Sequence, residues 1–274
     1  MTLQIYKPTH PVLKELVECF YILEQSIEEI PITYFTFPSI YTIVTISEKT
    51  KTIVNGNKII IQSCPNAIIE TNLVSNFNEP VLVNYEGKIN EITTYFKPLG
   101  INAFINHDLQ YYSKGTFPDF VPFDDYKDKM TSILSINNNN EKIEKLELYW
   151  ISKLRTFENP LVKKVIIEMM DSNNLNQSMS EISLKTGCSR TTIKKHFDKH
   201  ICKTPSQFKK IVRFRATIEN QIRKENRTNV SYSMDYFDQS HMIKDFKKLT
   251  GFTPKAFFSK VSMGENSKIK WLFV

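Results

Sequence analysis

A short basic segment occurs twice in the chain, at an interval of 49 residues. The first copy runs from Ser189 to Phe197 and the second from Asp238 to Phe246. Each copy begins with a residue that commonly caps a helix, and each carries two apolar residues four positions apart, as on the buried side of a helix. The duplication therefore predicts two similar helical units. A Thr-Pro pair, which typically begins another helix, and a phenylalanine follow both copies at the same distance: Thr204, Pro205 and Phe208, then Thr253, Pro254 and Phe257.

The residues before each basic segment complete a helix-turn-helix pattern, in which a supporting helix and a tight turn hold a second helix in the DNA major groove. In the first unit Ile182 anchors the supporting helix, Ser183 is small enough for close approach, and Gly187 suits the turn. Val230 and Ser231 take the first two of these places in the second unit. The outward positions then carry side chains suited to base edges and phosphates. These candidate DNA-binding residues are Arg190, Thr191, Lys194 and Lys195 in the first unit, and Gln239, Ser240, Ile243 and Lys244 in the second.

Local signals give the limits of the two basic helices. Ser189 and Asp238 are the expected N-terminal caps, and Gly251 stands where the second helix is expected to end. A long helix from Pro205 to about Lys224 joins the two units. Such a helix would hold them about 34 Å apart, which is one turn of DNA.

The charge of the chain is divided between its two parts. Residues 1–158 carry 14 Lys and Arg against 19 Asp and Glu, which is −5, whereas residues 159–274 carry 22 against 10, which is +12. A basic C-terminal part favours a polyanionic partner. Together with the duplicated basic helices, it predicts binding to double-stranded DNA.

The N-terminal part has a different pattern, with short runs rich in β-branched residues between residues 32 and 96, such as Tyr41–Ile46 and Lys58–Ile61. Between these runs, Asn55 and Gly56 form a favourable hairpin turn because both tolerate positive φ. Several short strands separated by turns predict a small barrel or sandwich.

The same part carries many aromatic residues, which could line an apolar pocket, although most are expected to be ordinary core. A metal site inside a barrel would need about three histidines and a carboxylate. The only histidines in this part are His10 and His107. We therefore expect no metal and no cofactor.

The segment between the two parts, residues 141–158, has apolar residues at helical spacing after a polar run at 137–140. It is too apolar for a lone exposed helix. It is expected to pack either on the N-terminal domain or against a second copy of the chain, and we favour a role in dimer formation.

The stretch from Tyr236 to His241, continued by Phe246 to Pro254, resembles the signature of the AraC/XylS family of bacterial transcription regulators. The resemblance covers about residues 160–260. It implies two helix-turn-helix units joined by a long helix and fused to a sensing or dimerisation domain. Asp235 and Cys202 stand where the family commonly has glycine.

The N-terminal part resembles the cupin-like sensing domains of the same family, through Tyr95–Gly100 and Phe37–Val44. The expected fold class is thus α+β, a β-rich cupin-like barrel followed by an all-α double helix-turn-helix domain. The expected domains are 1–136 for sensing, 141–158 as the helical dimerisation or linker segment, 160–260 for DNA binding, and 261–274 as a C-terminal tail.

The resemblance implies a sequence-specific regulator, in this family commonly an activator. The expected partners are promoter DNA, RNA polymerase, a small-molecule effector and a second copy of the chain. The sequence has no run of eighteen apolar residues and no signal-peptide pattern, so we expect no membrane partner and a cytoplasmic location. Two alternatives stay open: an enzyme fused to a DNA-binding module, and a protein that coats DNA without sequence preference.

Overall fold

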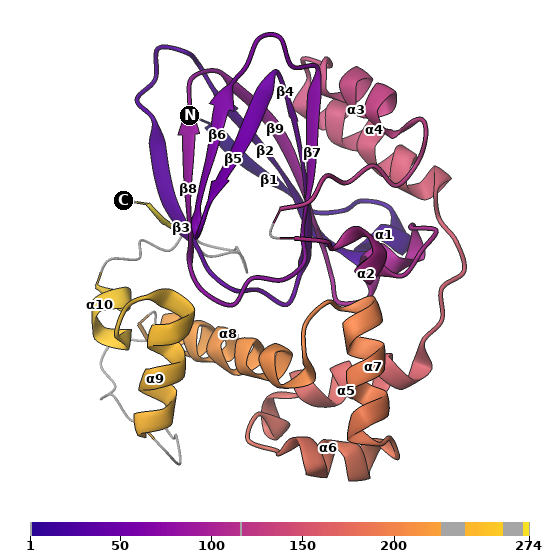
Figure 1. The fold of residues 1–274 in the computed structure, drawn as a ribbon, viewed down its shortest axis with the longest axis vertical. Coiled ribbons are helices and arrows are strands. Elements are labelled where there is room, and N and C mark those ends of the chain that lie inside the picture. Colours follow the sequence, from indigo (N-terminus) through magenta and orange to yellow (C-terminus); the bar gives the residue numbers. More distant parts are fainter. Residues whose placement is uncertain (1, 116, 226–238, 260–270, 274) are drawn as a thin grey trace.

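Strands gather in the first 96 residues and helices in the C-terminal part of the computed structural model, which describes residues 2–115, 117–225, 239–259 and 271–273. Two five-stranded sheets lie face to face, and the C-terminal helices lie below them in Figure 1. This arrangement confirms the expected α+β class. Among the described residues the two sheets share no strand, so the β-rich part is an open, two-sheet form of the expected barrel.

The first sheet is antiparallel throughout. From edge to edge its strands are β1 (Thr2–Tyr6), β2 (Val17–Gln25), β9 (Ile89–Phe96), β4 (Thr42–Glu48) and β7 (Ile69–Val74).

The second sheet contains one parallel pair, β6 with β8. From edge to edge its strands are β10 (Trp271–Phe273), β3 (Ile32–Thr36), β8 (Val81–Glu86), β6 (Lys58–Ser63) and β5 (Thr50–Asn55). A hairpin turn joins β5 and β6 as expected, but it lies one residue later than predicted. Asn55 pairs with Lys58 as the last residue of β5, so the turn residues are Gly56, with a φ of 58°, and Asn57. Strand β10 brings the C-terminal tail onto the edge of the sheet, beside β3.

The first sheet is covered on both faces, so its inner strand β2 is buried along nearly all of its length. Successive side chains of a strand point to opposite faces. Phe20 and Ile22 therefore belong to the core on the helical side, whereas Tyr21 and Leu23 belong to the core between the two sheets.

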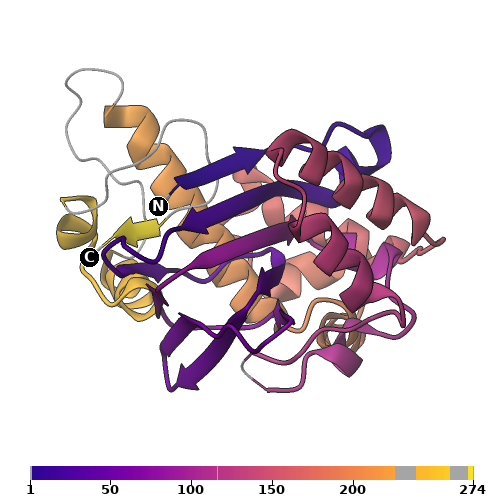
Figure 2. The ribbon, with the colours of Figure 1, turned by 90° about the horizontal axis from the view of Figure 1, so that it is seen from above.

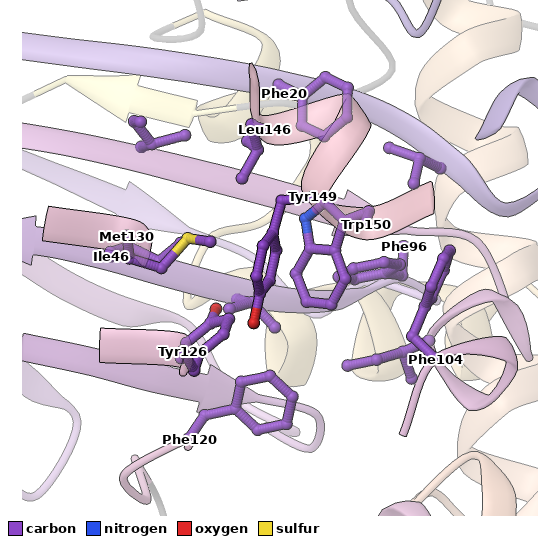
Figure 3. Close-up of a cluster of buried hydrophobic side chains, with 14 of the residues drawn as sticks. Phe20, Ile46, Phe96, Phe104, Phe120, Tyr126, Met130, Leu146, Tyr149 and Trp150 are labelled. Carbon is purple, nitrogen blue, oxygen red and sulfur yellow. The ribbon is translucent and has the colours of Figure 1, made fainter. Parts of the chain in front are cut away.

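Helices α3 (Tyr126–Leu134) and α4 (Asn139–Ser152) cover the outer face of the first sheet (Figures 1 and 2). Trp150 of α4 stands edge-on to Phe96 of the sheet, with ring centroids 5.1 Å apart (Figure 3). The polar run that precedes the apolar residues begins this helix, because the side chain of Asn138 caps it. The apolar face of α4 is thus buried within the chain itself.

Three short helices complete the N-terminal part: α1 (Pro11–Leu16), the 3₁₀ helix η1 (Gly100–Ala103) and α2 (Leu109–Tyr112). The C-terminal helices are α5 (Pro160–Met170), the 3₁₀ turn η2 (Ser172–Asn174), α6 (Met179–Thr186), α7 (Arg190–His200), α8 (Pro205–Glu225), α9 (Gln239–Thr250) and α10 (Pro254–Phe258). Helices α7, α8, α9 and α10 begin where the predicted caps and Thr-Pro pairs place them. No helix in the described ranges is both long enough and apolar enough to span a membrane.

The C-terminal helices pack tightly on the N-terminal part. Arg215 of α8 donates hydrogen bonds to the carbonyl oxygens of Phe37 and Pro38, at 2.9–3.1 Å. The ring of Phe37 also meets Phe257 of α10, with centroids 5.1 Å apart. Phe37 is fully buried and shares one hydrophobic core with the C-terminal helices, so the two parts are joined by a continuous packed interface.

The loop between β7 and β8 contacts both helical units. The ammonium group of Lys203, just before α8, donates to the carbonyl oxygen of Ser75 at the start of this loop. At its end, the Cγ of Pro80 lies 3.6 Å from where a Cβ would stand on Gly251, just after α9. Lys203 and Gly251 occupy nearly equivalent places in the two repeats, so one short loop meets both units at corresponding turns.

We expect Trp150→Ala to lower the free energy of unfolding by about 3–5 kcal/mol, because it empties a fully buried site in contact with four other rings. Leu148→Ala is the matched control on the same helix, since Leu148 is 53% exposed. Chemical denaturation of both variants measures the difference. Equal losses would contradict the packing of α4 described above.

The burial of Lys203 predicts how the free energy of unfolding depends on pH. Burial lowers its pKa from 10.5 to about 8, so between these values the unfolded chain holds the proton more tightly than the folded chain. Raising the pH through this window therefore favours folding. We expect the free energy of unfolding of the wild type to increase from pH 8 to pH 10 relative to that of Lys203→Met, measured by urea denaturation. Parallel pH curves for the two proteins would show that Lys203 is not buried.

Candidate DNA-binding surface

The first helix-turn-helix unit is built from α6 and α7, and its limits follow from local capping. Ser178 and Glu181 form a reciprocal capping box at the start of α6. Gly187 ends α6 with a φ of 73°, a left-handed conformation that glycine adopts without steric cost. Ser189 then caps α7 by accepting a hydrogen bond from the amide of Thr192 at 3.1 Å. The predicted turn and cap are both confirmed.

Helix α7 has one buried and one exposed face, as its spacing predicts. Ile193 and Phe197 are fully buried in the core of the C-terminal helices. The candidate residues Arg190, Thr191, Lys194 and Lys195 are all exposed. Lys194 forms an ion pair with Asp198 one turn later, at 2.6 Å.

The second unit is described from α9 onward. Ile243 and Lys244 are exposed on this helix, and Phe246 is buried at 2% exposure. Gln239 and Ser240 lie in its first turn, but their side chains, like that of Met242, fall outside the described residues. The expected supporting residues Val230 and Ser231, the turn residue Asp235 and the cap Asp238 also lie outside them.

The repeat in the sequence is also a repeat in the geometry. Phe197 meets Phe208 edge-on, with ring centroids 5.6 Å apart and an interplanar angle of 87°. The equivalent pair, Phe246 and Phe257, has values of 5.2 Å and 86°. The two units therefore pack their recognition helices in the same way.

The backbone repeats this correspondence after each recognition helix. Cys202 and Gly251, which are 49 positions apart, have φ values of 57° and 77°. The position where the family commonly has glycine is thus left-handed in the first unit too, although a cysteine occupies it. Thr204 and Thr253 then each accept a hydrogen bond from the amide three residues later, so both following helices start alike.

Helix α8 links the two units over 21 residues. Phe208 of α8 meets α7, and Phe214 of α8 meets α9 with ring centroids 5.2 Å apart. At a rise of 1.5 Å per residue, these two anchors are about 9 Å apart along the helix. The spacing of about 34 Å between the two DNA-binding helices, α7 and α9, therefore depends on how they diverge from α8. This spacing stays a prediction.

Charge is distributed unevenly around α9. Asp245 pairs with Lys210 at 3.0 Å and with Arg213 at 3.7 Å, so these two cations of α8 are partly neutralised. Lys244, Lys247 and Lys248 are exposed. The surface can therefore present basic side chains from α7 and α9 to a polyanion.

The sequence analysis missed how the end of α7 is attached to the N-terminal part. Asn102 of η1 donates to the carbonyl oxygen of His200 at 2.9 Å, and its own side-chain oxygen lies 3.2 Å from the His200 ring nitrogen. Asp108 pairs with the neighbouring Lys199 at 3.0 Å. Burial lowers the pKa of His200. No sequence signal could have revealed these contacts, because the partners are about 100 residues apart and belong to different domains.

Within the described ranges, no three His, Cys, Asp or Glu residues gather as a metal site requires. The four cysteines are free thiols.

Comparison with known proteins was made at the level of families, sequences and structures. A family model described as a helix-turn-helix domain matches residues 182–260. None of the curated proteins matches the chain significantly.

Three solved structures of ToxT from Vibrio cholerae are similar to this chain, each at 11% sequence identity. A structure at 1.65 Å resolution covers 94% of this chain and 98% of its own, with a TM-score of 0.44. A structure bound to an unsaturated fatty acid covers 93% and 94%, with a TM-score of 0.43. A third, from strain O395, covers 94% and 97%, with a TM-score of 0.42. Over residues 182–260, where the family model matches, this chain carries a helix-turn-helix domain of the AraC type.

Proposed function

We propose that this protein is a transcription regulator that binds a specific DNA sequence with both of its helix-turn-helix units. The observation that carries the proposal is the repeated geometry of the two recognition helices, each with its phenylalanine pair buried and basic residues exposed. A duplicated reading head suits an operator with two half-sites on one face of the DNA. An activating role, through contact with RNA polymerase, is part of the proposal and follows the family resemblance.

We assign two roles to the candidate residues. Arg190 and Gln239 are the proposed base readers, since arginine pairs well with guanine and glutamine with adenine in the major groove. Lys194, Lys195 and Lys244 are the proposed phosphate contacts. Thr191, Ser240 and Ile243 complete the surface that faces the groove.

We expect Lys195→Ala and Lys244→Ala each to weaken DNA binding and to flatten its salt dependence by about one unit of slope, because each removes one phosphate contact. Lys129→Ala is the matched control, since Lys129 is an exposed lysine of α3, away from the recognition helices. Binding titrations between 50 and 200 mM salt would measure the slope. If both variants bind as the control does, the assignment of these lysines is wrong.

A titration against DNA from upstream of the protein's own gene, with random DNA as competitor, tests specificity. We expect binding that survives competition, with a footprint covering two turns of DNA per chain. Equal loss to any competitor would instead favour the second candidate, a DNA-coating protein.

We further propose that the N-terminal part, residues 1–136, senses a small molecule. A cavity between the two sheets supports this, because Val74, Phe77 and Val81 line it and also belong to the β7–β8 loop or its ends. The same loop contacts both helical units through Ser75 and Pro80. A ligand that moved this loop would therefore act on both reading heads at once.

The remaining organisation is also proposed. Residues 160–260 form the DNA-binding domain, 261–274 the tail, and 141–158 a segment that contributes to a homodimer. Leu148 and Leu154 support the last assignment, because they stay 53% and 40% exposed after the rest of the apolar face is buried. Sedimentation of the wild type and of a Leu148→Asp variant tests it. The proposed location is the cytoplasm.

A further inference from the structure

The cavity between the two sheets has walls of unusual composition. Its volume is about 50 Å³. Its lining consists of aromatic and aliphatic side chains with two threonines, and it contains no Lys, Arg or His. The aromatic lining residues are Tyr21, Tyr34, Phe77, Tyr85, Tyr95 and Phe117.

A buried carboxyl group lies directly behind two of these rings. The hydroxyl groups of Tyr21 and Tyr85 each donate to the same oxygen of Glu91, at 2.9 Å. Thr93 donates to it as well, at 3.0 Å. Glu91 is only 1% exposed, and its position on β9 places it between the sheets, on the same face as Tyr95.

No salt bridge among the described residues neutralises Glu91. The other charged group that acts on it is Glu70 of β7, which is also acidic. Arg215 lies near Tyr95, but its hydrogen bonds go to the carbonyl oxygens of Phe37 and Pro38. Burial raises the pKa of Glu91, as expected for a carboxyl group without a nearby cation.

Aromatic rings attract cations through their negative faces. A tyrosine that donates its hydroxyl proton to a carboxylate becomes richer in electrons, so Glu91 strengthens this attraction at Tyr21 and Tyr85. An anion would be disfavoured, because it would meet aromatic side chains in the wall, Glu91 behind Tyr21 and Tyr85, and no basic side chain in the lining.

We propose that this cavity is a binding site for a compact organic cation, an ammonium group with apolar substituents. The aromatic rings contact the cation, and Glu91 acts through the two tyrosines that it holds. This cation would be the effector of the sensing function proposed above. Only its effect on DNA binding rests on that proposed function.

Two loops contribute to the cavity wall. Phe77 and Phe117 are the aromatic lining residues that lie outside the strands, and both are partly exposed. A cation in the cavity would contact Phe77 of the β7–β8 loop, which also holds Lys203 through Ser75 and lies beside Gly251. The site is therefore close to the element that meets both helical units.

Three probes of similar size and different charge test the proposal: tetramethylammonium, tert-butanol and pivalate. Each is titrated into the full-length protein by calorimetry at constant ionic strength. We expect tetramethylammonium to bind at least about tenfold more tightly than tert-butanol, with the weakest binding for pivalate. Preference for pivalate, equal affinities, or no saturable binding of tetramethylammonium would overturn the proposal.

Glu91→Gln separates the role of the charge from that of the shape, because glutamine still accepts the hydroxyl hydrogen bonds. We expect it to reduce the preference for tetramethylammonium over tert-butanol to about twofold. Glu86→Gln is the matched control, since Glu86 lies on the same sheet as Tyr85 but points to its opposite face. Equal affinities for tetramethylammonium in the two variants would exclude a role for Glu91.

The pH dependence gives a second readout that a purely structural role of Glu91 would not produce. The titratable groups that act on it are Tyr21 of β2, Tyr34 of β3, Glu70 of β7, Tyr85 of β8 and Tyr95 of β9. Because the carboxylate form attracts the cation, the affinity for tetramethylammonium should increase from pH 5.5 to pH 8 in the wild type and stay level in Glu91→Gln. A level wild-type profile would contradict the assignment.

The calorimetric measurement contains no DNA, so its outcome is independent of the proposed regulation. A parallel titration of upstream DNA with and without tetramethylammonium tests that function. Cation binding without any specific DNA binding would leave the site intact and refute the regulator. Specific DNA binding without cation binding would refute the site alone.

Discussion

The buried contact between Lys203 and the carbonyl oxygen of Ser75 joins the first helical unit to the N-terminal part, and much of the arrangement depends on it. Burying an ammonium group is unfavourable unless hydrogen bonds compensate for the lost water. Here the contact lies at a loop that also meets Gly251 of the second unit. One short segment of the N-terminal part therefore helps to position both recognition helices.

The helical units could be predicted from the sequence because their determinants are local. Ser189 and Gly187 specify where α7 begins and α6 ends through hydrogen bonds and backbone preferences within a few residues. The spacing of Ile193 and Phe197 then determines which face is buried. The same spacing leaves Arg190 and Lys195 on the opposite face of the helix, and both are exposed in the structure.

The arrangement of the sheets and the interface between the parts could not be predicted in this way. The parallel pairing of β6 with β8, the place of β10 beside β3, and the hydrogen bonds of Asn102 with His200 all join distant segments. The role of α4 was ambiguous for the same reason. Its apolar stripe could pack equally well on a sheet or on a second copy of the chain. Periodicity indicates which face of a helix is buried, but not what covers that face.

The two units are alike inside but attached to the N-terminal part by different contacts. In the first unit, the residue in the left-handed position is Cys202, whose side chain packs against the core under α4. A non-glycine residue there costs about 1–2 kcal/mol of backbone strain, which this packing offsets. In the second unit the equivalent Gly251 has no side chain, and the following Phe252 instead meets Phe35 of β3. The first helical unit is thus tied to the helical core of the N-terminal part, and the second to β3 of the second sheet. A change in the spacing of the two sheets, such as a ligand between them would cause, would therefore move one head relative to the other.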